Sequence, residues 1–238
     1  MINDRPRVPP SDPSEWGLSG ASITIGVDLG FSADHSAMAV ASCHHSNDAQ
    51  MIGIRELVEF PLQTPHEELA RAIVETALRY GNPRIVVDAS NNGAFLSLLA
   101  SRFGNSAPNH IIACTISGAQ EHGLTPQPYP LVLFGQKTNL HKWPLSRNAL
   151  LVDLAAEMEN STVKITATGD YEKLRTQLMA ITQEQRASGR IVYNSSGAAH
   201  DDLIIATAMS VWCARRLGQP PRRMNRQRQE KFSSRGWT

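Results

Sequence analysis

The chain has 238 residues, of which 23 are basic and 22 acidic, and its formal net charge is +1. This length suits one sizeable α/β domain rather than two, and the near-neutral charge does not by itself indicate a nucleic-acid partner. Cys43, Cys114 and Cys213 form no C-x-x-C pair, which argues against a disulfide framework or a cysteine zinc site and favours a reducing compartment. No apolar run approaches the about 20 residues that span a bilayer, and the start of the chain lacks a signal-peptide core, so we expect a soluble, non-secreted protein.

The first part of the chain is predicted to form an antiparallel meander followed by a helix. Residues 1–20 are rich in Pro, Ser and Asp and are interpreted as a linker or chain edge. The apolar and alternating runs predict three antiparallel strands, at 22–29, 37–42 and 51–60. Thr64 is a candidate N-cap, Pro65 a candidate first residue, and Gly81 the end of the amphipathic helix that follows.

Strands and helices are predicted to alternate in the rest of the chain. The nearly all-apolar runs at 84–88 and 111–115 are typical of strands buried on both faces, and a helix is expected between them at 93–103. Residues 118–144, with prolines at 126, 128 and 130, are interpreted as a long functional or mobile loop. The remaining expected elements are helices at 147–159, 171–184 and 199–216, the last apolar almost all round, and strands at 163–167 and 191–193.

These elements predict one α/β domain over residues 21–217, with a mixed central sheet flanked by helices. Beyond it, residues 218–238 carry many arginines. Such a basic block is typical of a disordered segment or of an arm that seeks phosphates.

Acidic residues occur where short apolar segments would not be expected to carry charge. Asp28 lies near the end of the first strand, Asp88 ends a parallel strand, and Asp201 and Asp202 precede the buried helix. Capping and turn roles could explain Asp88 and either member of the pair, but not Asp28. Open α/β sheets place ligands at the carboxyl ends of adjacent strands, and carboxylates repel one another unless a cation lies between them. We therefore expect the four carboxylates to share a metal site.

Hard oxygen ligands of this kind suit Mg²⁺ or Mn²⁺. Two such ions about 4 Å apart would support two-metal hydrolysis of a phosphodiester. Periodicity does not decide which of Asp201 and Asp202 is the direct ligand, so both are candidates. His200 is a candidate general base or phosphate contact, with local hydrogen bonding as the alternative.

Basic residues near the end of the predicted loop are candidate DNA contacts. Phosphate contacts from such groups are independent of sequence and are weakened by salt, although ordinary solvated surface charges are the alternative. The candidates are Lys137, His141, Lys142 and Arg147, together with the basic tail.

Several motifs are similar to those of a known family. They are IGVDLG at 25–30 with the strand AMAV at 37–40, VVD at 86–88, and above all HDDLI at 200–204 leading into an Ala-rich helix. Together they resemble the nuclease domain of the large terminase subunit of tailed bacteriophages, over residues 23–216. The resemblance implies a ribonuclease H-like fold and metal-dependent endonucleolytic cutting of concatemeric double-stranded viral DNA in the cytoplasm of the infected host.

The resemblance also implies partners and points to departures from the family. The implied partners are a packaging ATPase domain, the small terminase subunit and the portal; no membrane is involved. Ile205 stands where many relatives carry a further acidic residue. The chain contains no Gly-Lys dipeptide from which a Walker A loop could be built, so we expect a separated nuclease domain.

Two alternatives belong to other functional classes. An actin-like nucleotide-binding protein also begins with a Gly-x-Asp-x-Gly strand, but it needs two similar subdomains, for which this chain is short. A non-catalytic DNA-binding packaging module could retain the same fold. The full carboxylate set argues against it, because unneeded buried charges are costly.

Overall fold

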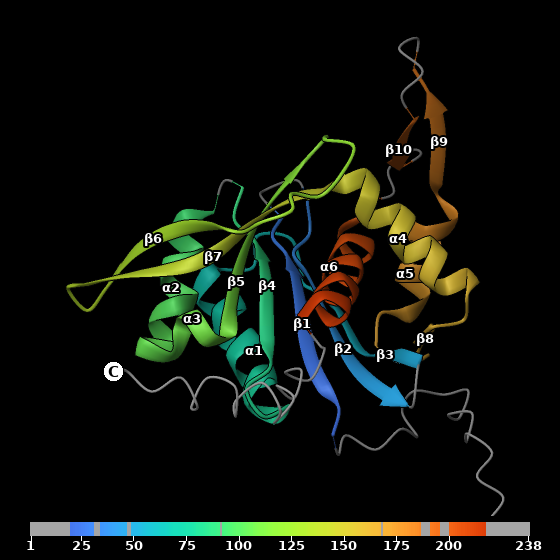
Figure 1. Ribbon diagram of the computed structural model, residues 1–238. Helices are drawn as coiled ribbons and strands as arrows, with labels where there is room; N and C mark the ends of the chain where they lie inside the picture. The colour runs from blue at the N-terminus through green and yellow to red at the C-terminus, as the bar shows by residue number, and fades with distance from the viewer. Residues whose placement is uncertain are drawn as a thin grey trace, which may run out of the picture.

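The computed structural model of the protein describes residues 20–30, 34–46, 49–90, 92–167, 169–186, 191–195 and 200–217. The predicted linker, except for Gly20, and the basic tail from residue 218 lie outside these ranges. The described residues form one main sheet with helices on both faces (Figure 1). They do not contain the two similar subdomains that an actin-like protein needs. None of the described helices has the length and apolarity required to cross a membrane.

The main sheet has eight strands in the order β6-β7-β5-β4-β1-β2-β3-β8, and a separate two-stranded ribbon pairs β9 with β10. The strands are β1 (Ser22–Asp28), β2 (Ala37–Ser46), β3 (Ala49–Glu59), β4 (Arg84–Asp88), β5 (Ile111–Ser117), β6 (Gln127–Leu133), β7 (Gln136–Ser146), β8 (Val163–Ile165), β9 (Ile181–Gln185) and β10 (Ile191–Ser195). The helices are α1 (His66–Arg79), α2 (Gly93–Phe103), the short 3₁₀ helix Gly104–Ser106, α3 (Ala107–His110), α4 (Arg147–Glu159), α5 (Tyr171–Met179) and α6 (Asp202–Leu217).

The central part of the sheet has the predicted arrangement. β1, β2 and β3 form the antiparallel meander, while β4 is parallel to both β1 and β5. Because successive side chains of a strand point to opposite faces, the sheet separates two cores. Ile25 and Val27 of β1 pack on the side of α1 and α2, whereas Ala39 of β2 packs on the side of α4 and α6.

Helix α6 is buried as predicted, and Gly26 allows it to lie directly on β1. A Cβ atom at Gly26 would lie 2.0 Å from the carbonyl oxygen of Ala206 and 2.7 Å from the amide nitrogen of Ser210. The buried Thr24 hydroxyl donates a 2.9 Å hydrogen bond to the Ser210 carbonyl oxygen. Backbone therefore packs on backbone here, and the first turn of α6 is held near the end of β1.

The prediction of a long loop at 118–144 was wrong. Most of that segment forms the β6–β7 hairpin, which extends the sheet at one edge (Figure 1). Phe134 and Gly135 both have positive φ, 50° and 79°, as expected for a two-residue turn matched to the strand twist. Prolines are tolerated in β6 because it is an edge strand, which need not donate on its outer side.

Three helix boundaries also differ from the prediction. Helix α5 ends at Met179 rather than at residue 184, because residues 181–185 pair with β10 in an antiparallel ribbon. Thr64 is not the N-cap of α1; Pro65 occupies that position, and the Thr64 hydroxyl donates to the Pro61 carbonyl oxygen. Helix α6 begins at Asp202 rather than at residue 199, and residues 196–199 lie outside the described ranges.

Candidate metal centre

Asp28 and Asp88 are neighbours at one edge of the sheet. β1 and β4 are adjacent parallel strands in which Val27 is aligned with Val87, and the two aspartates are the last residues of these strands. Parallel strands end at the same edge of a sheet, so their carboxylates emerge side by side. The predicted placement of both residues at carboxyl ends is confirmed.

Helix α6 brings the second acidic pair to the same edge. Asp202 is the first residue of α6 and is only 7% exposed, and the preceding Asp201 accepts the amide of Ile205 at its carbonyl oxygen. The buried Oδ2 atom of Asp202 accepts no hydrogen bond from any described residue. A buried carboxylate oxygen without a donor is costly and suggests a site for a cation.

The electrostatics of Asp28 show that the other three carboxylates lie close enough to affect it. Burial raises the pKa of Asp28 well above its ordinary value of 3.8, and the charges of Asp88, Asp202 and Asp201 raise it further. Burial also raises the pKa of Asp202 to about 6, with the Asp201 charge as the next cause. The neighbouring aspartate charges therefore disfavour ionisation of Asp28 and of Asp202, as expected for carboxylates that lack a compensating cation.

Three of the four carboxylates already have partners, and that of Asp28 is the Leu29 backbone amide. Oδ1 of Asp88 accepts hydrogen bonds from the amide (2.9 Å) and the hydroxyl (2.6 Å) of Ser90. Oδ2 of Asp201 accepts a hydrogen bond from the Arg147 guanidinium and forms an ion pair with it. In this arrangement, no group of three or more Asp, Glu, His or Cys side chains among the described residues has the geometry to hold a metal ion.

The donor set nevertheless fits a hard divalent cation. It consists of carboxylate oxygens, one of which is buried without a donor, and the mutual repulsion would be relieved by positive charge. Cation binding would require the Asp88 and Asp201 side chains to change partners. Asp28, Asp88, Asp201 and Asp202 are therefore the residues that could hold such an ion.

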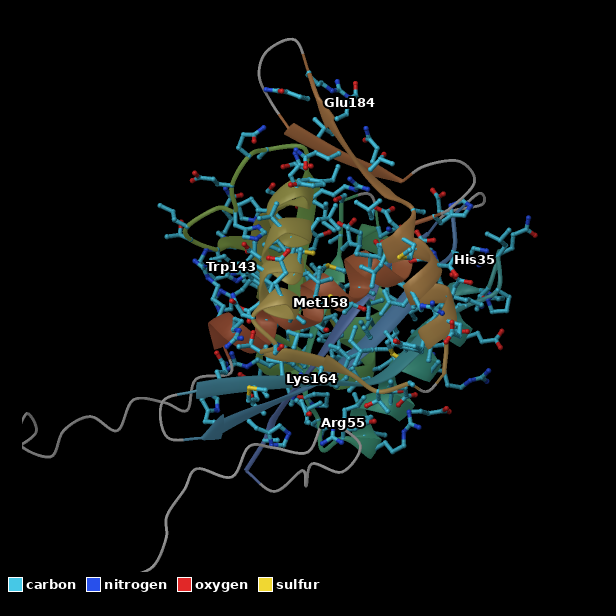
Figure 2. All side chains as sticks on the ribbon, turned by 90° about the vertical axis from the view of Figure 1, so that its right-hand side faces the viewer. His35, Arg55, Trp143, Met158, Lys164 and Glu184 are labelled. Carbon is cyan, nitrogen blue, oxygen red and sulfur yellow. The ribbon has the colours of Figure 1, made fainter. Side chains whose placement is uncertain are left out.

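His200 lies beside the acidic cluster and is oriented by a carboxylate. Its Nδ1 atom is 3.1 Å from Oδ1 of Asp34, and its ring stands edge-on to that of His35 with the ring centroids 6.0 Å apart. His35 is itself bound at Nδ1 to the Phe60 carbonyl oxygen, 2.8 Å away, and Figure 2 labels it at one end of the sheet. If Asp34 accepts the Nδ1 proton, Nε2 of His200 is the acceptor nitrogen.

The four basic residues predicted to contact DNA do not form one cluster. Arg147 begins α4 and lies beside Asp201. On β7, Trp143 is at the level of Asp88, with β5 between them. His141 lies two positions before Trp143 on the same strand. Lys137 lies six positions before Trp143, which is about 20 Å along the strand. Lys142 points to the opposite face, where its ammonium lies 5.6 Å from the centre of the Tyr129 ring.

Several partners of the acidic residues were missed by sequence reasoning. Ser90 is two residues from Asp88 and could have been expected as part of an Asx-type turn. Asp34 is 166 residues away from its partner His200, and Arg147 is 54 residues away from its partner Asp201. No local pattern in the sequence indicates either pairing.

Solved structures with a similar fold include nuclease domains of viral terminases. The large terminase nuclease of the thermophilic phage G20c aligns with a TM-score of 0.54 and 16% identity, over 81% of this chain and 82% of that chain. The P22 large terminase nuclease domain has a TM-score of 0.53 and 13% identity, over 86% of each chain. The manganese-soaked human cytomegalovirus terminase nuclease domain has a TM-score of 0.51 and 14% identity, over 87% of this chain and 90% of that one.

At these identities the comparison establishes the fold, which is the predicted ribonuclease H-like fold of large terminase nuclease domains. The G20c nuclease has also been solved with bound magnesium, and that structure aligns with a TM-score of 0.52. No protein-family model matches the chain, and no curated protein is significantly similar to it in sequence.

Proposed function

We propose that this protein is a metal-dependent endonuclease that hydrolyses phosphodiester bonds of double-stranded viral DNA during genome packaging. The observation that carries the proposal is the convergence of Asp28, Asp88 and the Asp201–Asp202 pair at the carboxyl edge of the sheet, where each charge raises the pKa of Asp28. The fold shared with phage terminase nucleases supports the same activity.

In this proposal the four aspartates hold Mg²⁺ or Mn²⁺, with room in the donor set for two ions. Divalent ions supply Lewis-acid charge to the attacking water and to the leaving oxygen of a phosphodiester. Asp28 and Asp88 are fixed by the ends of two adjacent strands, and Asp202 by the packing of α6 on Gly26. The backbones of these residues are thereby held in position before the substrate binds, and only side-chain rearrangements are needed to take up the metal.

His200 is the candidate proton acceptor for the attacking water. Its contact with Asp34 holds the ring in place and favours the tautomer with a basic Nε2 atom. The ring is 42% exposed at the edge of the acidic cluster, so an incoming phosphate can reach it. Phosphate contact is therefore its second role in the proposal.

We further propose that the DNA backbone runs from the carboxylates towards the β6–β7 hairpin. Lys137 and His141 are exposed on the hairpin face that also carries Trp143, and Lys142 and the basic tail would add charge at the margins. A packaging ATPase domain, the small terminase subunit and the portal would complete the assembly in the host cytoplasm. The support for these partners is the terminase-like fold alone.

A plasmid-cleavage assay tests the proposed activity. Purified protein is expected to nick or linearise supercoiled DNA of any sequence in Mn²⁺ or Mg²⁺, and to leave it intact in EDTA. Asp28→Asn is expected to lower the rate at least about 100-fold, because it removes a central carboxylate while nearly preserving side-chain volume.

The matched control is Glu172→Gln, which neutralises an exposed carboxylate of α5 that forms an i,i+3 pair with Arg175. Its cleavage rate should equal that of the wild type. Cleavage that persists in EDTA, or that is unchanged in Asp28→Asn, contradicts the proposal. DNA binding without any cleavage would instead favour the non-catalytic packaging module.

A further inference from the structure

The Arg147 guanidinium connects the acidic cluster to the β9–β10 ribbon. It donates one hydrogen bond to the Asp201 carboxylate and another to the Tyr193 carbonyl oxygen of β10. Both charged partners are largely shielded, because the Arg147 side chain is 27% exposed and that of Asp201 is 23% exposed. Figure 2 shows Glu184 on the same ribbon, which stands out from the body of the protein.

The first turn of α4 holds Tyr193 at both of its backbone groups. Arg147 binds the carbonyl oxygen, and Oδ1 of the next residue, Asn148, accepts the Tyr193 amide at 3.4 Å. The two α4 residues therefore share a structural role towards β10. Arg147 also contacts the acidic cluster through Asp201, and of the two residues only Arg147 carries a charge.

The acidic cluster needs positive charge when no metal is bound. The Asp201 charge acts on both Asp28 and Asp202, and the latter is 7% exposed. In the described part of the chain, Arg147 is the cationic side chain that forms an ion pair with one of the four aspartates. It therefore offsets part of the repulsion that would otherwise act across the cluster.

We propose that Arg147 is a positioning residue that serves as the protein's own counter-cation for Asp201 and competes with a divalent ion for that carboxylate. The inference rests on the proposed function, since it assumes that the aspartates bind a metal. Without metal, Arg147 keeps Asp201 paired and turned towards β10. When a divalent ion takes the Asp201 oxygens, the guanidinium gives up this contact, and its positive charge lies at the edge of the site, where a DNA phosphate would approach.

Competition between Arg147 and a divalent ion changes metal affinity and protein stability in a direction that can be measured. Removing the Arg147 charge should tighten metal binding, because the ion no longer has to displace a guanidinium, and should destabilise the metal-free protein, because the cluster loses its counter-cation. A merely structural role in holding β10 would lower stability equally with and without metal and would leave metal affinity unchanged. Asn148→Ala is the matched control, since it removes the other contact to Tyr193 and leaves the charge of Arg147 in place.

The experiment measures Mn²⁺ binding by calorimetry and melting temperature with EDTA or saturating Mn²⁺, all without DNA. Arg147→Gln is expected to bind Mn²⁺ about tenfold more tightly than the wild type. It should melt about 3 °C lower in EDTA, with the difference shrinking in Mn²⁺. Arg147→Lys keeps the charge and should remain close to the wild type in both measurements, whereas Asn148→Ala should lower both melting temperatures equally without changing Mn²⁺ affinity.

The outcomes separate this inference from the proposed function. Unchanged or weaker Mn²⁺ binding in Arg147→Gln, with normal binding by the wild type, overturns the competition and leaves the nuclease proposal intact. A wild type that binds no Mn²⁺ and cuts no DNA overturns both. If Arg147→Gln fails to fold, arginine side-chain NMR of the wild type gives the answer: Mg²⁺ should speed rotation of the Arg147 guanidinium, and unchanged rotation would contradict the inference.

Discussion

Asp28 illustrates how a single residue can be unfavourable for folding and still be needed for function. The carboxyl group ends a strand whose four preceding residues, 24–27, are buried, and three other aspartates raise its pKa. The folded protein therefore holds a proton on this group more tightly than the unfolded chain does. As the pH rises above 3.8, the unfolded carboxyl ionises first, and the unfolding free energy falls.

This cost predicts opposite effects of Asp28→Asn on stability with and without metal. In EDTA at pH 7 the variant should be more stable than the wild type by about 1 kcal/mol or more, because one pKa unit corresponds to about 1.4 kcal/mol. Saturating Mn²⁺ should stabilise the wild type and have little effect on the variant. Chemical denaturation in EDTA and in Mn²⁺ measures the unfolding free energies. Glu172→Gln is the control, and its unfolding free energy is expected to lie within about 0.5 kcal/mol of that of the wild type.

A destabilised Asp28→Asn variant in EDTA would mean that the Asp28 carboxylate makes a favourable contact in the metal-free protein. The mutual repulsion of the four aspartates would then be too weak to require a cation.

At the level of elements, the packing of α6 on β1 decides where the second acidic pair lies. Glycine at position 26 leaves no side chain between the two backbones, so the carbonyl oxygen of Ala206 can lie over the strand. The Thr24 hydroxyl bond to Ser210 fixes the helix along the same strand. The first turn of α6 then lies beside the end of β1, which brings Asp202 into the neighbourhood of Asp28.

Gly26→Ala is therefore expected to destabilise the protein by about 3 kcal/mol, since the added methyl would collide with helix backbone that cannot move independently. Metal affinity should fall with stability, because any shift of α6 moves Asp202. Gly81→Ala is the control: its added methyl meets no atom within 4 Å, and its φ of +78° should cost only about 1 kcal/mol. Denaturation and Mn²⁺ titration measure both effects, and equal losses in the two variants would contradict the close-packing explanation.

For the molecule as a whole, acidic and basic groups are separated along one sheet. The carboxylates gather at the carboxyl ends of β1 and β4, while Lys137 and His141 lie further along the β6–β7 hairpin. The predicted basic surface is thus spread along a strand rather than gathered in a loop. A duplex bound across it would contact the protein through its phosphates and without sequence preference.

Binding of duplex DNA is expected to weaken steeply with salt, and Lys137→Gln should reduce the slope of log K against log salt by about 1. Fluorescence anisotropy at several salt concentrations, in Ca²⁺ or with the Asp28→Asn variant to prevent cutting, measures this slope. Lys164→Gln, which neutralises a lysine of the distant strand β8, is the control and should leave the slope unchanged. DNA binding that is indifferent to ionic strength would exclude the proposed phosphate contacts.

Local patterns in the sequence were sufficient to predict most of the central fold. The apolar runs of β1, β4 and β5 and the buried character of α6 report directly on burial, and the structure confirms these elements. They also predicted that Asp28 and Asp88 emerge at the same sheet edge. The β6–β7 hairpin was missed because its prolines argue against a strand unless the strand lies at an edge, and edge position is a property of the assembled sheet.

Only the tertiary structure decided which side chains become partners across the site. The Arg147–Asp201 pair and the Asp34–His200 contact join residues that are distant in sequence, so no periodicity or spacing encodes them. The amino-acid sequence by itself determined the elements and their acidic ends, because burial and strand direction leave local signatures. The packing of α4 and α6 on the sheet decided the charge pairing, because electrostatic interactions depend on distances that exist only once the chain is folded.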